Sequence, residues 1–139
     1  MALPAVELAI LIDDNDIDLF VQKRFVEINQ FAERVITYNK PMLAIRALME
    51  EVPVLDIPQL IFLDLNMPEM DGFGFLENFK QFPQSVRDKS KVIVVTSSSS
   101  QVDKDRALCY GCVIHFMSKP LSEKDLDLIR DKVVTLSNS

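Results

Sequence analysis

The chain has 139 residues, 48% of them hydrophobic and 26% charged, which suits one globular domain large enough to bury its own core. Its formal net charge of −6 argues against a broad nucleic-acid-binding surface, because such a surface needs clustered Lys and Arg. The sequence contains neither a membrane span of about 20 apolar residues nor a basic, apolar signal peptide, so we expect a cytoplasmic protein.

Apolar runs alternate with helical patterns along the chain. Strands are predicted at residues 7–12, 33–38, 60–64, 91–96 and 113–117. The third of these runs is apolar without alternation until its last residue, which is typical of a parallel strand buried on both faces. Helices are predicted at about residues 17–28, 41–48, 72–79, 100–109 and 122–133, with a polar connection at residues 82–90.

Local signals support the predicted helices. The first helix carries an apolar stripe at helical spacing, formed by Ile17, Phe20, Val21, Phe25 and Ile28. Ser100 with Asp103, and Ser122 with Asp125, have the spacing of capping boxes at helix N-termini. Gly111 is predicted to be the C-cap of the helix that ends near residue 109.

The alternation of strands and helices predicts a parallel sheet with right-handed crossovers and helices on both faces. The loops that follow the strands then meet at the carboxyl edge of the sheet, where open α/β sheets bind ligands. Four of these loops carry polar residues: Asp13-Asp14, Asp64, Thr96 and Lys119-Pro120. We therefore expect these side chains to lie close together.

Acidic residues gathered at one edge repel one another, and they ionise together only if a cation joins them. Carboxylate oxygens suit Mg²⁺, which also retains several waters. One carboxylate can also attack a phosphoryl group and become an aspartyl phosphate, provided that cationic groups surround the phosphoryl oxygens. Lys119 supplies such a charge and Thr96 a hydroxyl donor, while the small Ser97 leaves room near Asp64.

Each of these residues also has a purely structural interpretation. Asp13 and Asp14 can cap a helix, Lys119 can be an exposed loop lysine, and Thr96 is a good β-former. Asp64 alone can simply end a strand and start a turn. The functional interpretation rests on the joint occurrence of all four motifs at one edge of one sheet.

The two cysteines form a CxxC motif, Cys109 to Cys112. A thioredoxin-like redox pair or half of a zinc site has this spacing. The chain has no second CxxC for zinc, and its single histidine, His115, is interpreted as a strand residue. The redox motif normally opens a helix, whereas Cys109 ends one, so a structural role is favoured.

The four motifs resemble the receiver domain of two-component response regulators. The resemblance rests on Asp13-Asp14, Asp64-x-Asn66-Met67-Pro68-x-Met70-Asp71-Gly72, Thr96-Ser97 and Lys119-Pro120, each after a predicted strand. It covers about residues 7–136 of a single domain spanning residues 1–139. It implies an α/β fold of the flavodoxin-like kind, with strand order 2-1-3-4-5 and five helices.

The resemblance implies a role for the acidic residues by position. Asp64 is the expected phosphate acceptor, and a histidine kinase or histidine phosphotransfer protein is the expected donor. Asp13, Asp14 and Asp64, together with the backbone carbonyl of Asn66, are the expected Mg²⁺ ligands.

The resemblance also implies a switch. Lys119 is expected to pair with the phosphate and to precede a cis bond to Pro120. Thr96 is expected to turn inward to hydrogen-bond the phosphoryl group, and Phe116 to follow inward. A phosphoryl group adds charge and acceptor oxygens that bias a two-state surface, here expected at residues 101–134.

The sequence departs from the family pattern in places. Phe116 stands where Tyr is frequent, so a switch there rests on packing without a hydroxyl. The segment from Gly111 to Lys119 is one residue longer than the usual spacing. Ser98 and Asn66 occupy positions at which the family tunes dephosphorylation, so the sequence leaves the lifetime of a phosphorylated state open.

Because the sequence ends at Ser139, just past the last predicted helix, we expect a stand-alone receiver without direct nucleic-acid or membrane binding, although a piece of a longer regulator would look the same. Such a receiver acts by binding a protein partner or by passing phosphate along a relay. Beyond phosphorylation and dephosphorylation of its own Asp64, no enzymatic activity is expected. Two alternatives stay open. A haloacid-dehalogenase-type phosphotransferase also uses an aspartyl nucleophile with Mg²⁺, but it expects Asp where Asn66 stands. A receiver-like binding module that never takes phosphate is disfavoured by the intact acidic pair, Asp64 and Lys119.

Overall fold

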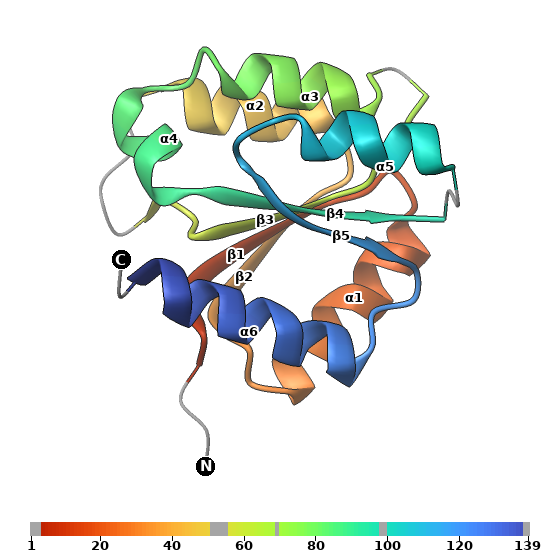
Figure 1. The fold of residues 1–139 in the computed structure, drawn as a ribbon, viewed down its shortest axis with the longest axis vertical. Helices are drawn as coiled ribbons and strands as arrows, with labels where there is room; N and C mark the ends of the chain where they lie inside the picture. The colour runs from red at the N-terminus through yellow and green to blue at the C-terminus, as the bar shows by residue number, and fades with distance from the viewer. Residues whose placement is uncertain (1–3, 51–55, 69, 98–99, 138–139) are drawn as a thin grey trace.

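The computed structural model describes residues 4–50, 56–68, 70–97 and 100–137. Five parallel strands form one sheet in the order β2-β1-β3-β4-β5 (Figure 1), which confirms the expected flavodoxin-like fold. The strands are β1 (Val6–Ile12), β2 (Ala32–Tyr38), β3 (Leu60–Leu63), β4 (Lys91–Thr96) and β5 (Val113–Ser118). The helices are α1 (Asp16–Ile28), α2 (Pro41–Met49), α3 (Gly72–Phe79), α4 (Gln84–Lys89), α5 (Gln101–Leu108) and α6 (Glu123–Ser137).

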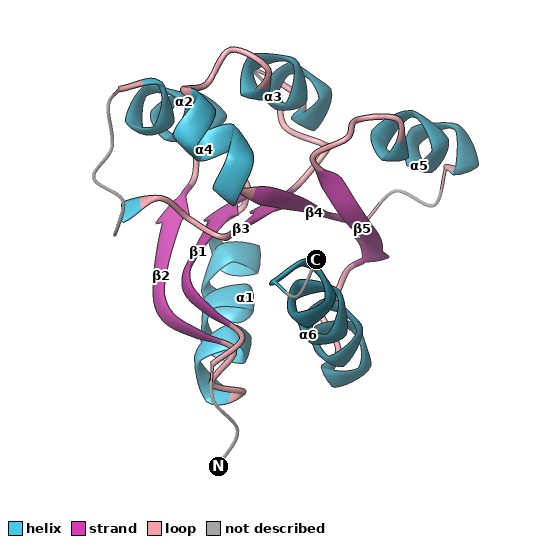
Figure 2. Cartoon of the chain, turned by 60° about the vertical axis from the view of Figure 1, so that its left-hand side comes forward, coloured by secondary structure: helices cyan, strands magenta, loops and turns pink. Residues whose placement is uncertain are grey.

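The helices cover both faces of the sheet. α1 and α6 lie on one face, and α2, α3, α4 and α5 lie on the other (Figures 1 and 2). Each face therefore buries its own apolar cluster against the sheet, as a doubly wound fold requires. Within the described part of the chain, no helix has both the length and the apolar character needed to cross a bilayer.

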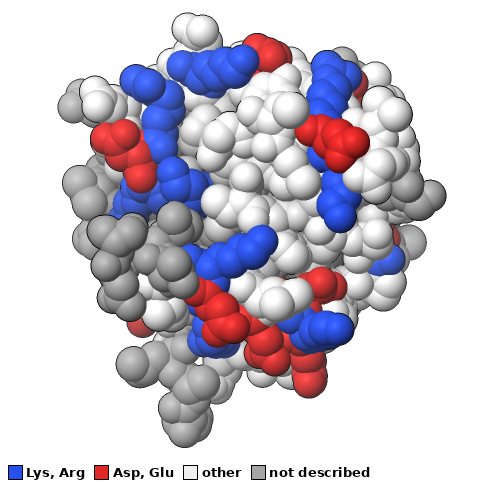
Figure 3. Space-filling model, in the orientation of Figure 1, with Lys and Arg blue, Asp and Glu red and all other residues white. Residues whose placement is uncertain are grey.

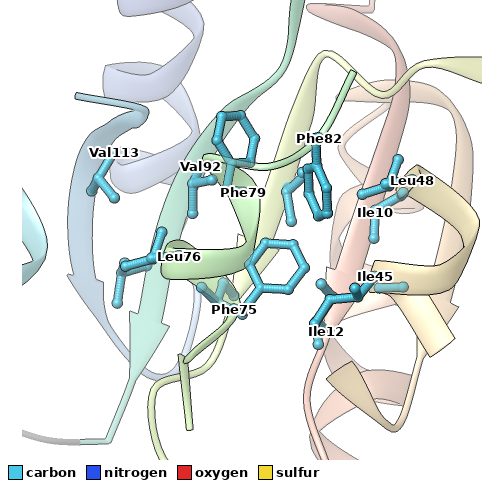
Figure 4. Packing of buried hydrophobic residues seen from close by; sticks show 14 of the residues in the cluster. Ile10, Ile12, Ile45, Leu48, Phe75, Leu76, Phe79, Phe82, Val92 and Val113 are labelled. Carbon is cyan, nitrogen blue, oxygen red and sulfur yellow. The ribbon is translucent and has the colours of Figure 1, made fainter. Parts of the chain in front are cut away.

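The apolar cluster beneath α2 and α3 holds the central strand in place (Figure 4). Phe82 lies edge-on to Phe75 and Phe79, with ring centroids 5.8 and 5.4 Å apart respectively. All four residues of β3 are buried, as its continuous apolar run predicted. The end of β3, where Asp64 follows, is therefore fixed by the packed core.

The described part of the chain forms six helices rather than the five predicted, because most of the predicted polar connection at residues 82–90 forms α4. Helical periodicity could not reveal this element, since Val86 is the one buried residue among its six. After α4, the buried Ser90 hydroxyl donates a hydrogen bond to the Pro58 carbonyl, which ties this segment to the approach to β3.

Most of the apolar stripe predicted for α1 is exposed instead of packed on the sheet, and of its five residues Phe25 packs against the apolar cluster on this face. Ile17 is 75% exposed and Phe20 is 67% exposed. The buried residues of α1 are Leu19, Gln22 and Val26, which form a different stripe at the same helical spacing. Periodicity alone does not tell which of two stripes faces the sheet, and the polar Gln22 disguises the buried one.

Both predicted capping boxes have their N-cap hydrogen bonds. Asp103 N–H donates to Ser100 Oγ at 3.3 Å, and Asp125 N–H donates to Ser122 Oγ at 3.1 Å. The prediction for the other end of α5 was wrong: Cys109 is the C-cap, and Gly111 lies two residues further on. Because Cys109 ends the helix in a right-handed conformation and no described glycine has a positive φ, this end needs no glycine.

β5 pairs with β4 through a shift in register. Val92 pairs with Val113, whereas Ile93 pairs with His115, so Ile114 is left between the two pairs as an extra residue. This bulge takes up the additional residue noted between the glycine and the lysine of this segment.

A cluster of polar groups from α6 covers the bulge. Lys132 Nζ donates to the Ile114 carbonyl at 2.7 Å and contacts His115 Nδ1 at 3.0 Å. Asp125 Oδ1 lies 3.9 Å from His115 Nε2. Burial and the neighbouring charge of Lys132 lower the pKa of His115 below its ordinary value, and Asp125 offsets this only in part.

We expect His115 to make stability fall as the pH drops below about 6.5, the ordinary pKa of an unfolded histidine. His115 binds a proton less readily in the folded protein than in the unfolded chain. Stability is therefore lost as the pH falls from about 6.5 through the lowered pKa of His115 in the folded protein. Urea unfolding at several pH values should show the loss in the wild type and not in His115→Gln. Since the chain has one histidine, parallel pH curves for the two proteins would contradict this assignment.

Candidate functional site

The carboxyl ends of the strands bring together the acidic residues that the sequence singled out. Asp13 and Asp14 follow β1, and Asp64 follows β3. One carboxylate oxygen from each of the three lies within 4.8 Å of the others. Because β1 and β3 are neighbours in the sheet, their ends deliver these three side chains to one point.

Asp13 is buried, with 1% of its surface exposed, and its carboxylate is held on both sides. Oδ1 accepts the backbone N–H of Asn15 at 2.9 Å, and Oδ2 accepts the side-chain amide of Gln22 at 3.2 Å. The Asp13 N–H donates to the Tyr38 carbonyl at 3.2 Å, continuing the pairing of β1 with β2. Asp14, in contrast, is exposed to solvent.

Asp64 is also buried, with 4% of its surface exposed. Its N–H donates to the Ile12 carbonyl at 3.0 Å, which extends the pairing of β3 with β1 by one residue. Its Oδ1 accepts the backbone N–H of Asn66 at 3.1 Å in a tight turn. The carboxylate is therefore oriented by the strand end and by the turn that follows it.

Lys119 places its ammonium among three carboxylates. Its Nζ lies 2.7 Å from Asp13 Oδ2, 2.9 Å from Asp18 Oδ2 and 3.3 Å from Asp64 Oδ2. The Lys119 N–H donates to the Thr96 carbonyl at 2.9 Å, so the end of β4 fixes the base of the side chain. The following bond to Pro120 is cis, as the resemblance implied.

The pKa values of Asp64 and Lys119 are both raised, for different physical reasons. Burial raises the pKa of Asp64 above its ordinary value, and the charge of Asp13 adds to this, although the Asn66 N–H and Lys119 oppose it. Burial alone would lower the pKa of Lys119, but its hydrogen bonds to Asp13 and Asp18 and the charge of Asp64 raise it. The lysine is thus held as a cation beside carboxylates that outnumber it.

The two remaining residues of the expected switch lie at different depths. Thr96 is fully buried at the end of β4, and its Oγ1 accepts the Asn66 side-chain amide at 3.1 Å. Phe116 on β5 is half-buried and packs against the apolar cluster under α2 and α3. Ser98, which stands at a position where the family tunes dephosphorylation, lies outside the described residues.

Two polar residues of the site, Asp18 and Gln22, were missed in the sequence. Both project from α1, one helical turn apart, and they contact Lys119 and Asp13 respectively. Gln22 stands four residues before the buried Val26 and is itself buried. A polar residue at helical spacing from an apolar one was the available signal for Gln22, because a buried polar side chain needs a hydrogen-bond partner.

The CxxC motif does not contribute to this site. Cys112 precedes β5, at the opposite end of that strand from Lys119, and both thiols are free. Burial raises the pKa of Cys112 to about 11, which disfavours the thiolate that redox chemistry and metal binding require. The structural interpretation of the motif is supported.

The fold and the site together define a class of protein: a doubly wound α/β domain with an acidic, lysine-bridged site at the carboxyl edge of its sheet. A family model of the response regulator receiver domain matches residues 9–129. The chain therefore belongs to the receiver domain family of two-component signalling.

Individual proteins show the same relationship. The chain is similar to a response regulator receiver protein from Dyadobacter fermentans (28% identity, TM-score 0.81, 93% of this chain and 96% of that one). A two component response regulator from Cytophaga hutchinsonii is similar at 27% identity and a TM-score of 0.81, over 93% of this chain and 97% of that one. The sensor histidine kinase GacS of Pseudomonas protegens is 25% identical over 115 residues, which are 83% of this chain but 12% of that protein.

Proposed function

We propose that this receiver accepts a phosphoryl group on Asp64 from a histidine kinase or histidine phosphotransfer protein. The observation that carries the proposal is the position of Lys119 Nζ, 3.3 Å from Asp64 Oδ2 at the mouth of the acidic cluster. A fixed ammonium beside the attacking carboxylate can neutralise charge on the phosphoryl oxygens as they approach.

The phosphoryl transfer needs no reactant besides the phosphorylated donor, and dephosphorylation needs water. An Asp64 carboxylate oxygen attacks phosphorus, the bond from phosphorus to the donor imidazole nitrogen breaks, and that nitrogen keeps the electron pair of the broken bond. In dephosphorylation, water attacks phosphorus, the bond to Asp64 breaks, and inorganic phosphate leaves with the carboxylate restored. Apart from these steps on its own side chain, we propose no enzymatic activity.

We propose that Asp13, Asp14 and Asp64, with the Asn66 carbonyl, hold Mg²⁺. The donor set fits the ion, since Mg²⁺ prefers oxygen ligands and keeps several waters, which the exposed side of Asp14 admits. When bound, the ion supplies positive charge to the phosphoryl oxygens. A receiver domain with the same fold, that of sensor histidine kinase PA1611 from Pseudomonas aeruginosa (19% identity, TM-score 0.73), has a magnesium ion coordinated in its active site cleft.

We expect Mg²⁺ to stabilise the folded protein. At about 100 times its dissociation constant, binding to the folded state alone raises the free energy of unfolding by about 2.7 kcal/mol. Urea unfolding with and without MgCl₂ measures this, and Asp56→Asn is the matched control because Asp56 is an exposed acid paired with Arg34, outside the cluster. Asp64→Asn should lose most of the gain. If the wild type gains nothing, the alternative of a receiver-like module that never takes phosphate is favoured.

The partner surface is proposed at about residues 101–134, the segment that the resemblance to receiver domains implied. β5 is the edge strand, with α5 and α6 on its two sides (Figures 1 and 2). Val102 of α5 and Leu128 of α6 are exposed apolar residues on these helices. On the face seen in Figure 3, basic and acidic side chains are interspersed, which fits a protein partner better than nucleic acid.

The decisive experiment is phosphorylation by acetyl phosphate with MgCl₂, read by intact-protein mass spectrometry. We expect one phosphoryl group on the wild type and on Asp56→Asn, and none on Asp64→Asn. Equal labelling of Asp64→Asn would refute the assignment of the acceptor. Catalytic turnover of a phosphate ester would instead revive the haloacid-dehalogenase-type alternative.

The single-domain extent, the stand-alone arrangement and the cytoplasmic location stay predictions.

A further inference from the structure

Asp18 is the partner of Lys119 that the proposed chemistry does not use. Its Oδ2 lies 2.9 Å from Lys119 Nζ, closer than that of Asp64 at 3.3 Å. It stands outside the group of three carboxylates that could hold a metal ion. Its position is set by the first turn of α1, where its N–H donates to the Asn15 side chain at 3.0 Å.

An ammonium has three N–H donors, and the three carboxylates around Lys119 already engage it. A phosphoryl group on Asp64 would bring further acceptor oxygens and up to two negative charges to the same place. Across the described residues, the ion pairs found for Asp13 and Asp64 involve Lys119 alone. One of its present contacts must therefore weaken when the phosphoryl group arrives.

Solvent exposure indicates which contact weakens. The side chains of Asp13 and Asp64 are 1% and 5% exposed, so without Mg²⁺ removing their partner leaves a buried charge without compensation. With Mg²⁺ bound as proposed, the ion would take over the charges of these two carboxylates, and Asp18, outside the metal cluster, would be the carboxylate still paired with Lys119. The Asp18 side chain is 42% exposed, and water can replace the lysine there at little cost.

We propose that Asp18 competes with the phosphoryl group for Lys119, and so acts as a positioning residue that opposes the phosphorylated state. This inference rests on the proposed acceptance of phosphate at Asp64. In the unphosphorylated protein, the Asp18–Lys119 ion pair ties the first turn of α1 to the loop after β5. A cavity of about 110 Å³, lined partly by Val21, Phe25 and Leu121, lies between these two segments. Phosphorylation releases the tie beside this cavity.

The test measures the affinity of the full chain for beryllofluoride, a mimic of the phosphoryl group, by NMR titration in MgCl₂. Asp18→Asn should bind beryllofluoride about two- to five-fold more tightly, the factor that a half-exposed ion pair contributes. Asp18→Glu, which keeps the carboxylate, should bind beryllofluoride with an affinity close to that of the wild type. Asp16→Asn is the matched control, because it removes an acid from the same turn whose neighbour is Asn39 instead of Lys119.

The outcomes separate this inference from the proposed function. If the wild type binds beryllofluoride and Asp18→Asn binds it equally or more weakly, Asp18 does not compete and the inference is overturned while Asp64 keeps its role. An equal change in Mg²⁺ affinity would also overturn it, because Asp18 would then act on the metal site. If the wild type neither binds the mimic nor takes phosphate from acetyl phosphate, the proposed function fails first.

Discussion

Lys119→Met is expected to lower the free energy of unfolding by about 3 kcal/mol at pH 7 without Mg²⁺, the cost of stranding a buried charge. Met keeps much of the length and apolar stem of Lys but lacks the ammonium. Asp13 and Asp64 would then face each other as buried carboxylates with their shared cation gone. The measurement is urea unfolding in the presence of a chelator.

The loss should shrink as the pH falls. Without the ammonium, the folded-state pKa of Asp64, already raised by burial, rises further, so the folded protein takes up protons more readily than the unfolded chain. Each proton taken up removes repulsion from the folded state. The difference in stability between wild type and variant is therefore largest at neutral pH and smallest in acid.

Two further variants test whether the loss of stability comes from the buried carboxylates. Lys119→Met combined with Asp64→Asn should recover part of the loss, because one of the stranded charges is gone. Lys80→Met is the control: Lys80 pairs with Glu77 on the surface, both side chains being more than half exposed, and its loss should cost no more than about 0.5 kcal/mol. If Lys119→Met is as stable as the wild type, the ammonium merely offsets its own desolvation.

Much of this site was predictable because strand ends follow simple rules. The apolar run that ends at Asp64 has no alternation, so it was predicted to be a buried parallel strand whose carboxyl end lies at the edge where open α/β sheets bind ligands. The same reasoning placed Asp13, Thr96 and Lys119 at that edge. In the structure, Lys119 Nζ lies 2.7 Å from Asp13 Oδ2, and the Lys119 backbone N–H lies 2.9 Å from the Thr96 carbonyl oxygen.

The parts that could not be predicted depend on how elements turn and pair in three dimensions. Asp18 and Gln22 reach the site because α1 presents Leu19 and Val26 to the sheet, and the more apolar stripe containing Phe20 pointed to a different rotation. Contacts with the sheet decide which of the two stripes is buried. The periodicity of a single helix carries no information about those contacts.

Short or irregular elements left too little pattern. Val86 is the one residue that α4 buries, so neither the helical spacing nor the strand alternation of apolar residues could be detected in it. The bulge at Ile114 was visible only as one residue too many, and its location depends on the pairing of β5 with β4.

A second large effect is expected at Gly72, the first residue of α3, which packs against the end of β3. A Cβ added there would lie 2.6 Å from Leu65 Cδ2, 2.7 Å from the Asp64 carbonyl oxygen and 2.8 Å from Leu65 Cα. Two of these atoms belong to the backbone that carries the proposed phosphate acceptor. A side chain at position 72 therefore cannot be accommodated by a change of rotamer alone.

Gly72→Ala should accordingly lower the free energy of unfolding by about 1–3 kcal/mol, the usual cost of overpacking, and slow the phosphorylation of Asp64 by acetyl phosphate. Both effects arise because α3 and the strand end must move apart, which shifts Asp64 relative to Lys119. Gly111→Ala is the matched control, because a Cβ there meets no atom within 4 Å and its φ is not in the left-handed region. Unfolding and labelling rates should be measured for both variants. If Gly72→Ala labels as fast as Gly111→Ala, the strand end is free to shift without disturbing the site, and the close approach of α3 serves stability alone.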